Sequence, residues 1–169
     1  MRVSLVLLIL SIWITGCTQK YFIVRHAEKA QATAGTVMNT PNDPPLTDAG
    51  ATRARDLATR LSREKIHYIF STNTTRTQST AKPTAELFNT KVEIYGNVDS
   101  LLMARLRSLH KNVLVVGHSN TVDELVNGLM GKSMLSDLPD YAYDNLFIVR
   151  RKGKKITFSR EKFGQPAVK

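Results

Sequence analysis

The fold is decided by residues 21–26, which read Tyr-Phe-Ile-Val-Arg-His. An aromatic and β-branched run of this length is typical of a buried strand. In open α/β folds, ligands bind beyond the carboxyl ends of such strands, and Arg25 and His26 stand at that end. A guanidinium matches phosphate oxygens with a rigid fork of donors, and an imidazole can act as a nucleophile or a base. The run therefore predicts a strand end that binds an anion.

A second copy of the pattern lies at residues 113–121, which read Val-Leu-Val-Val-Gly-His-Ser-Asn-Thr. Here again an apolar run ends at a histidine, His118, and polar residues follow it. Two strands that each deliver a histidine at the carboxyl end are difficult to explain as packing alone. We therefore expect His26 and His118 to face one site.

Strand and helix patterns alternate along the rest of the chain. The sequence predicts strands at 21–26, 68–70, 91–95 and 113–116, helices at 47–64, 75–89, 99–109 and 119–130, and a closing hairpin at 145–150 and 155–160. This alternation indicates an α/β fold with a mostly parallel central sheet and helices on both faces. Residues 27–46 are rich in helix breakers, and we expect them to form a loop at the rim of the site.

Some local features of the expected helices can be specified. Thr47 and Asp99 are suited to be N-caps, and Pro83 is expected to interrupt or bend its helix. The inward side chains of the first two helices are predicted to be Ala51, Ala54, Leu57, Ala58 and Leu61, then Ala81, Ala85, Leu87 and Phe88.

The composition indicates one globular domain with a basic surface. The chain has 169 residues, is 42% hydrophobic and carries a formal net charge of +10, which favours anionic partners. Most positive charges are scattered, so nucleic acid is not predicted as a partner. The one dense basic run, residues 150–155, fits either the solvated turn of a hairpin or a patch that faces a membrane surface.

The amino-terminal residues resemble a bacterial lipoprotein signal. Residues 3–14 are mostly apolar, too short to span a bilayer comfortably but suited to the core of a signal peptide. Residues 14–17, Ile-Thr-Gly-Cys, resemble the lipobox, in which the cysteine is lipidated and the peptide is cut before it. Cys17 is the only cysteine, which excludes an intrachain disulfide. An ordinary secretory signal and an uncleaved transmembrane anchor are the alternatives.

The lipobox interpretation divides the chain and predicts its location. It gives a signal peptide at 1–16, a lipidated tether at 17–20 and one domain at 21–169. Thr18 replaces the aspartate associated with inner-membrane retention, so the expected location is the outer membrane, facing the periplasm. If the first strand is parallel to its neighbours, the site should face away from that membrane.

A second arginine, Arg76, is predicted to lie in the first turn of a helix. Unpaired backbone amides and the helix dipole favour an anion there. An isolated arginine on a helix is usually an exposed residue without a functional role. Beside Arg25, His26 and His118, however, Arg76 completes a pocket that suits a phosphoryl group.

Four motifs resemble those of the histidine phosphatase superfamily, also called phosphoglycerate mutase-like. They are Arg-His-Ala-Glu at 25–28, Leu-Thr-Asp-Ala-Gly at 46–50, Arg-Thr-Gln-Ser-Thr-Ala at 76–81 and Gly-His at 117–118. Their order and spacing are those of the family over about residues 20–125. Only 41 residues separate Arg76 from His118, which leaves no room for a cap domain, so the resemblance implies a short form with an open pocket.

The resemblance implies a covalent mechanism without a cofactor or a metal. His26 would accept the phosphoryl group, and water would hydrolyse the phosphohistidine. Arg25, Arg76 and His118 would hold the phosphoryl oxygens, and Asn120 would add a further donor. A zinc site is disfavoured because the two histidines lack helical spacing and a third ligand.

The proton donor is left unassigned by the motifs. Relatives use a carboxylic acid after the second arginine motif or directly after the second histidine, where this chain has Ser119. Glu28 is near the nucleophile in sequence, but it fits equally well as an ion-pair partner that orients a loop. Glu93 falls inside a strand. The asparagine that mutases carry six residues after the nucleophile is Ala32 here.

The expected function is hydrolysis of a phosphomonoester or a phosphoprotein. Export disfavours a phosphoglycerate mutase-type phosphotransferase, because a periplasmic enzyme cannot take part in cytosolic glycolysis. The other alternative is a non-catalytic lipoprotein that retains the pocket to bind a phosphorylated ligand.

Overall fold

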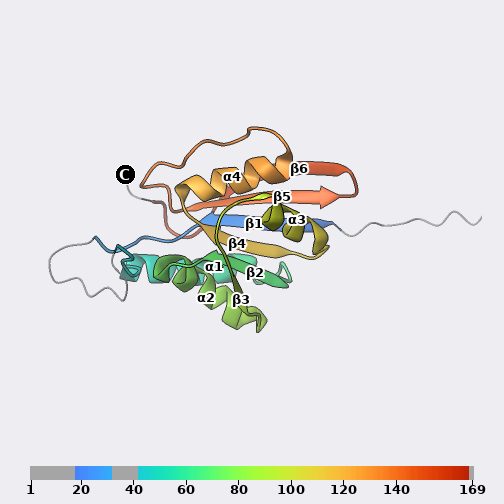
Figure 1. Cartoon of the computed structure of the whole chain (residues 1–169). Helices are drawn as coiled ribbons and strands as arrows, with labels where there is room; N and C mark the ends of the chain where they lie inside the picture. The colour runs from blue at the N-terminus through green and yellow to red at the C-terminus, as the bar shows by residue number, and fades with distance from the viewer. Residues whose placement is uncertain (1–17, 32–41, 168–169) are drawn as a thin grey trace, which may run out of the picture.

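The computed structural model describes residues 18–31 and 42–167. The elements in chain order are β1 (Gln19–Arg25), α1 (Asp48–Leu61), β2 (Tyr68–Thr72), α2 (Thr75–Phe88), β3 (Val92–Tyr95), α3 (Ser100–Ser108), β4 (Val113–Gly117), α4 (Ser119–Met130), β5 (Asn145–Lys152) and β6 (Lys155–Lys162). Figure 1 shows the sheet with α4 on one side and α1 and α2 on the other. The predicted α/β class, with helices on both faces, is confirmed.

The sheet has six strands in the order β3-β2-β4-β1-β5-β6. The first four strands in the chain are parallel, and β5 and β6 form the predicted antiparallel hairpin beside β1. In the β1–β4 pair, Tyr21 lies opposite Val113 and Arg25 lies opposite Gly117. The two strands that were expected to deliver histidines are therefore neighbours and end at the same edge.

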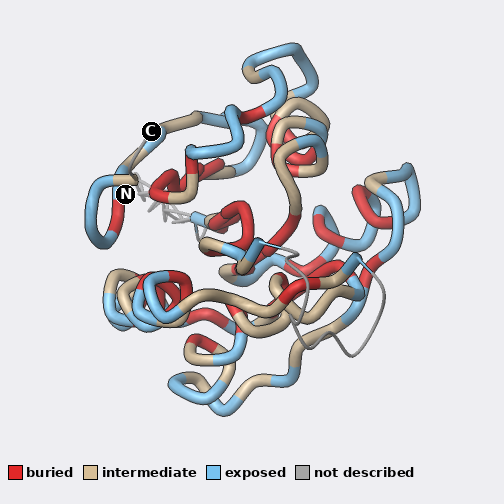
Figure 2. Tube along the Cα trace, turned by 90° about the vertical axis from the view of Figure 1, so that its left-hand side faces the viewer, coloured by how far each residue is buried: buried red, intermediate tan, exposed pale blue. Residues whose placement is uncertain are grey.

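Alternation of side chains along the strands produces a core on each face of the sheet. Residues of α1 and α2 pack on one face with side chains that include Phe22, Leu57, Leu114 and Ile148. Residues of α3 and α4 pack on the other with Ile23, Leu106, Val115, Leu125 and Phe147. In Figure 2 the buried stretches lie at the centre and the exposed ones on loops and outer helix faces.

The helix ends agree with the expected caps. The Thr47 hydroxyl accepts from the Gly50 amide, and the Asp99 carboxylate accepts from the Leu102 amide. The first helix is shorter than predicted, because it ends at Leu61 rather than at residue 64.

Pro83 was expected to interrupt or bend its helix. The helix is not interrupted there and continues to Phe88, although a proline removes one backbone hydrogen bond. Leu87 was expected inward but is 52% exposed. The buried face of α2 runs through Thr77, Ala81 and Thr84, and at 3.6 residues per turn Leu87 turns away from it.

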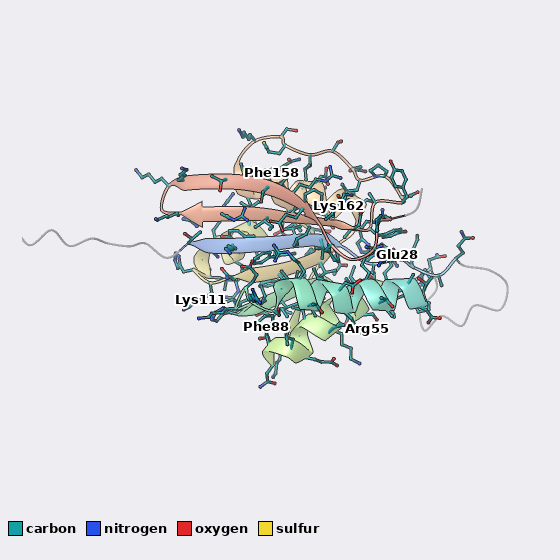
Figure 3. All side chains as sticks on the ribbon, turned by 180° about the vertical axis from the view of Figure 1, so that it is seen from behind. Glu28, Arg55, Phe88, Lys111, Phe158 and Lys162 are labelled. Atoms are coloured by element: carbon teal, nitrogen blue, oxygen red, sulfur yellow. The ribbon has the colours of Figure 1, made fainter. Side chains whose placement is uncertain are left out.

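The two ends of the sheet are chemically distinct. Glu28 lies at the end where β1 terminates, and Lys111 lies at the opposite end, as Figure 3 shows. The β5–β6 turn is at the Lys111 end, because Gln19 at the start of β1 pairs with Arg151. No helix in the described part of the chain is long and apolar enough to cross a membrane. The predicted signal peptide and Cys17 lie outside the described residues.

Candidate active site

His26 and His118 lie together at the carboxyl edge of the sheet, as expected. Their ring centroids are 5.4 Å apart in an edge-to-face arrangement. The His26 amide donates to the Gly117 carbonyl at 2.9 Å. This hydrogen bond continues the β1–β4 pairing as far as His26, and Gly117 is the residue directly before His118.

One hydrogen bond fixes the tautomer of His26. Its Nδ1 lies 2.7 Å from the carbonyl oxygen of Ala27, and because a carbonyl can only accept, Nδ1 carries the hydrogen and Nε2 keeps the lone pair. Burial, with a smaller contribution from the charges of Arg25 and Arg76, lowers the pKa of His26 to about 3. The ring is therefore neutral at pH 7, with an unprotonated Nε2 available to a ligand.

His118 is held by the end of β2. Its Nε2 lies 3.0 Å from the Thr72 hydroxyl oxygen, and its Nδ1 lies 3.5 Å from Nη2 of Arg76. The guanidinium is the donor to Nδ1, so the hydrogen of His118 is on Nε2 and points to Thr72. Burial, and then the charges of Arg76 and Arg25, lower the pKa of His118 to about 4.

Arg25 is buried and held rigidly. Its Nη1 donates to the carbonyl oxygens of Pro139 and Asp140 at 2.9 and 3.1 Å, and its guanidinium lies 4.5 Å from the centroid of the Tyr143 ring. Its Nε is buried and has no hydrogen-bond partner among the described residues. The carbonyl contacts keep the orientation of the guanidinium constant while one buried N–H is unsatisfied.

Arg76 lies in the first turn of α2, as predicted. Its guanidinium and the amino end of the helix bind the same carboxylate, that of Asp43. Its Nη1 donates to one oxygen of Asp43 at 3.0 Å, and the other oxygen accepts the Thr75 amide at 2.6 Å. Burial alone would raise the pKa of Asp43, but the Thr75 hydrogen bonds and the Arg76 charge outweigh it and lower the pKa. A hollow of about 370 Å³ adjoins this contact. The helix end and Arg76 thus already stabilise a negative charge.

The remaining predicted site residues are placed less centrally. Glu28 forms a bidentate pair with Arg53, whose Nε is 2.9 Å from both carboxylate oxygens. This arrangement matches the alternative interpretation of Glu28 as an ion-pair partner that orients the segment after His26. Asn120 is exposed on the first turn of α4. Glu93 pairs with Arg105 across 3.6 Å on β3.

At two motif positions, Gly50 and Gly117, only glycine fits sterically. A Cβ on Gly50 would collide with the carbonyl oxygen of Glu28, so only glycine lets α1 approach the segment after His26. A Cβ on Gly117 would collide with the Thr121 hydroxyl and lie 2.7 Å from the Tyr95 hydroxyl. Both glycines therefore fix the backbone beside the two histidines.

Sequence reasoning missed Asp43, Asp140 and Tyr143. The Tyr143 ring centroid lies 5.9 Å from that of His26. The sequence did contain a signal that could have found Tyr143. If the predicted hairpin lies antiparallel beside the first strand, the residues just before Asn145 must lie at the carboxyl end of that strand. Asp43 lies in the predicted rim loop, whose residues 32–41 are outside the described part of the chain.

Comparison with known proteins finds similarity over part of the sequence. Residues 21–99 match the histidine phosphatase superfamily, branch 1. A Photorhabdus laumondii protein described as phosphoglycerate mutase GpmB is 32% identical over 93 residues, which are 55% of this chain and 39% of that protein. The chain thus spans about two fifths of the curated relative it matches.

Solved structures share the fold over most of the chain. A protein from Agrobacterium tumefaciens, described as the phosphohistidine phosphatase SixA, has a TM-score of 0.61 at 20% identity, covering 87% of this chain and 98% of its own. The phosphoserine phosphatase of Entamoeba histolytica has a TM-score of 0.60 at 15% identity, covering 88% and 98%. The sequence of residues 21–99 is thus similar to the histidine phosphatase superfamily, and the described chain shares its fold with these solved structures.

Proposed function

We propose that the protein is a metal-independent phosphatase that works through a phosphohistidine on His26. The observation that carries the proposal is a buried, neutral His26 whose Nδ1 is committed to the Ala27 carbonyl. Its Nε2 is thereby left as a nucleophile beside two guanidiniums. The match of residues 21–99 to the histidine phosphatase model, and the fold shared with proteins that are described as phosphatases, support the reaction class.

The proposed reaction has two steps. In the first, Nε2 of His26 bonds to phosphorus and the bond to the leaving oxygen breaks. That oxygen takes a proton from water. In the second, water attacks phosphorus and the phosphorus–nitrogen bond breaks. Arg25 and Arg76 stabilise the charge on the phosphoryl oxygens in both steps. His118 joins them when its Nε2–H turns from the Thr72 hydroxyl to a phosphoryl oxygen, and Asn120 would add a donor to a larger substrate.

The competing functions make different use of the same site. A mutase must return the phosphoryl group to a bound second substrate, and the asparagine associated with mutases is Ala32 here. A non-catalytic lipoprotein would bind the phosphorylated ligand without turnover. The neutral His26 favours the phosphatase, because simple anion binding gains nothing from a desolvated nucleophile.

We further propose that the protein is lipid-anchored through Cys17 and works in the bacterial envelope, at the outer membrane facing the periplasm. The support is the lipobox-like Ile-Thr-Gly-Cys at residues 14–17. The parallel sheet adds that β1 begins at one end of the domain and delivers His26 at the other, so the site would face away from the lipid.

The test is turnover of an aryl phosphate by the full chain in the presence of a strong chelator. An aryl leaving group needs no acid, so the wild-type protein should turn over. We expect His26→Ala to lower kcat/KM by at least about 10³-fold, and the exposed His67→Ala to leave it unchanged. Tight binding of the aryl phosphate without turnover would instead show the binding function, and activity only with added metal would overturn metal independence.

A further inference from the structure

A second cavity lies at the end of the sheet opposite His26. It has a volume of about 210 Å³ and is lined by Tyr21, Arg107, Leu129, Val149, Arg151, Gly153, Lys154 and Ile156. It sits beside the start of β1 and the β5–β6 turn, which Figure 1 shows at the same end of the sheet. The proposed phosphatase mechanism uses none of these residues.

Two arginines line this cavity, and neither has a carboxylate partner among the described residues. Arg107 donates to the Gly128 carbonyl at 2.7 Å, and Arg151 donates to the Arg107 carbonyl at 3.1 Å. Within the described residues no aspartate or glutamate forms an ion pair with either arginine, whereas the adjacent Arg150 is 3.8 Å from Glu161. The charges of both arginines also act on the buried Tyr21 hydroxyl. Their positive charge is therefore available to a ligand.

The rim of the cavity is basic, and part of its lining is apolar. Lys152, Lys154 and Lys155 are exposed on the turn, where Lys152 pairs with Lys155 in the β5–β6 register, and Lys111 lies at the same end in Figure 3. The floor is formed by the buried Leu129 and Val149, and Ile156 is partly exposed. A free phosphate would gain nothing from this apolar floor. A phospholipid would place its phosphate on the guanidiniums and its first carbons on the floor.

We propose that this end of the molecule docks on an anionic phospholipid bilayer, with the cavity receiving a headgroup phosphate. The contact goes beyond the proposed phosphatase activity and is independent of it. Juxtamembrane cations gain energy from anionic lipid surfaces, and docking through this end leaves His26 on the far side, open to substrates in solution.

The test is co-sedimentation of the full chain with vesicles of phosphatidylcholine, alone or mixed with phosphatidylglycerol. The apolar amino-terminal residues contribute on both vesicle types, so the measured quantity is the gain caused by phosphatidylglycerol. The double variant Arg107→Gln/Arg151→Gln should reduce that gain by about 10- to 30-fold. The matched variant Arg55→Gln/Lys82→Gln removes two exposed charges from α1 and α2 and should reduce it by less than about threefold.

Equal losses in both double variants would overturn the proposal, because net charge alone would then explain the binding. It would also be overturned if inorganic phosphate or a short DNA duplex competed as strongly as phosphatidylglycerol. Both double variants should keep wild-type turnover of the aryl phosphate, which shows that they fold and separates this proposal from the phosphatase proposal.

Discussion

Arginines gather at both ends of the central sheet, but the chain holds them differently. At the carboxyl end of β1, Arg25 and Arg76 donate to carbonyl and carboxylate oxygens of the chain and adjoin two histidines with lowered pKa values. At the amino end, Arg107 and Arg151 border an open cavity and have no acidic partner in the described chain. Charge alone is enough to attract an anion, whereas a reaction with the anion requires side chains that are fixed and desolvated.

The same contrast divides the histidines. The chain has four, and the two at the carboxyl end, His26 and His118, are buried or half-buried, while His67 and His110 are exposed ahead of β2 and β4. The residues that can react with a ligand therefore lie at one end of the strands, and those that can only attract an anion lie at the other.

The largest effect is expected from exchanging arginine for lysine at the two ends. Arg25→Lys should lower kcat/KM for an aryl phosphate by at least about 100-fold, because an ammonium cannot reproduce the planar fork that meets the two carbonyls and the Tyr143 ring. Arg151→Lys should leave kcat/KM unchanged. Steady-state kinetics checks both, and equal losses would remove the distinction between the two ends.

The next-largest effect is expected on the free energy of unfolding, through the ion pair between Glu28 and Arg53 beside the site. Glu28→Gln should lower the free energy of unfolding by roughly 2–3 kcal/mol, because it leaves the buried Arg53 with a neutral partner. Glu93→Gln, which breaks an exposed pair with Arg105, should change it by less than about 1 kcal/mol. Denaturant unfolding measures both free energies.

Glu28→Gln also tests the possible role of Glu28 as the acid. If Glu28 only positions the segment after His26, turnover should fall equally for aryl phosphates with good and poor leaving groups. A loss confined to poor leaving groups would show that Glu28 is the proton donor.

The smallest predicted effect is a dependence of stability on pH. Folding keeps His26 neutral down to about pH 3, whereas a histidine in the unfolded chain binds a proton near pH 6.5. The unfolded state therefore binds more protons between these values, and the free energy of unfolding falls as the pH falls. From pH 7.5 to pH 5 this contribution is about 1–2 kcal/mol.

Unfolding of variants at the two pH values checks this contribution. His26→Gln should show a smaller loss of stability at pH 5 than the wild-type protein, and His110→Gln should behave like the wild-type protein. Identical losses in all three proteins would mean that His26 is not held neutral.

Much of this arrangement follows from local sequence. A buried parallel strand that ends in Arg-His places those side chains at the ligand edge, so the convergence of Arg25, His26, Arg76 and His118 could be predicted from strand and helix ends alone. The caps at Thr47 and Asp99 depend only on the next three residues, so they could also be predicted from the sequence.

The remainder depends on contacts between distant residues. Tyr143 meets His26 only because β5 returns antiparallel to β1, and Asp43 reaches Arg76 across 33 positions of sequence. The Glu28–Arg53 pair likewise joins a loop to a helix. In each case residue type alone allowed several partners. The β1–β5 pairing selected the partner of Tyr143, and the positions of α1 and α2 selected those of Glu28 and Asp43.

Trapping of the covalent intermediate shows directly whether Nε2 of His26 accepts the phosphoryl group. The full chain, mixed briefly with an aryl phosphate and quenched in base, should carry one acid-labile, base-stable phosphoryl group that peptide mapping assigns to His26 and ³¹P NMR to Nε2. The His26→Ala variant should carry none. A phosphoryl group on another residue, or undiminished turnover by His26→Ala, would contradict a phosphohistidine on His26.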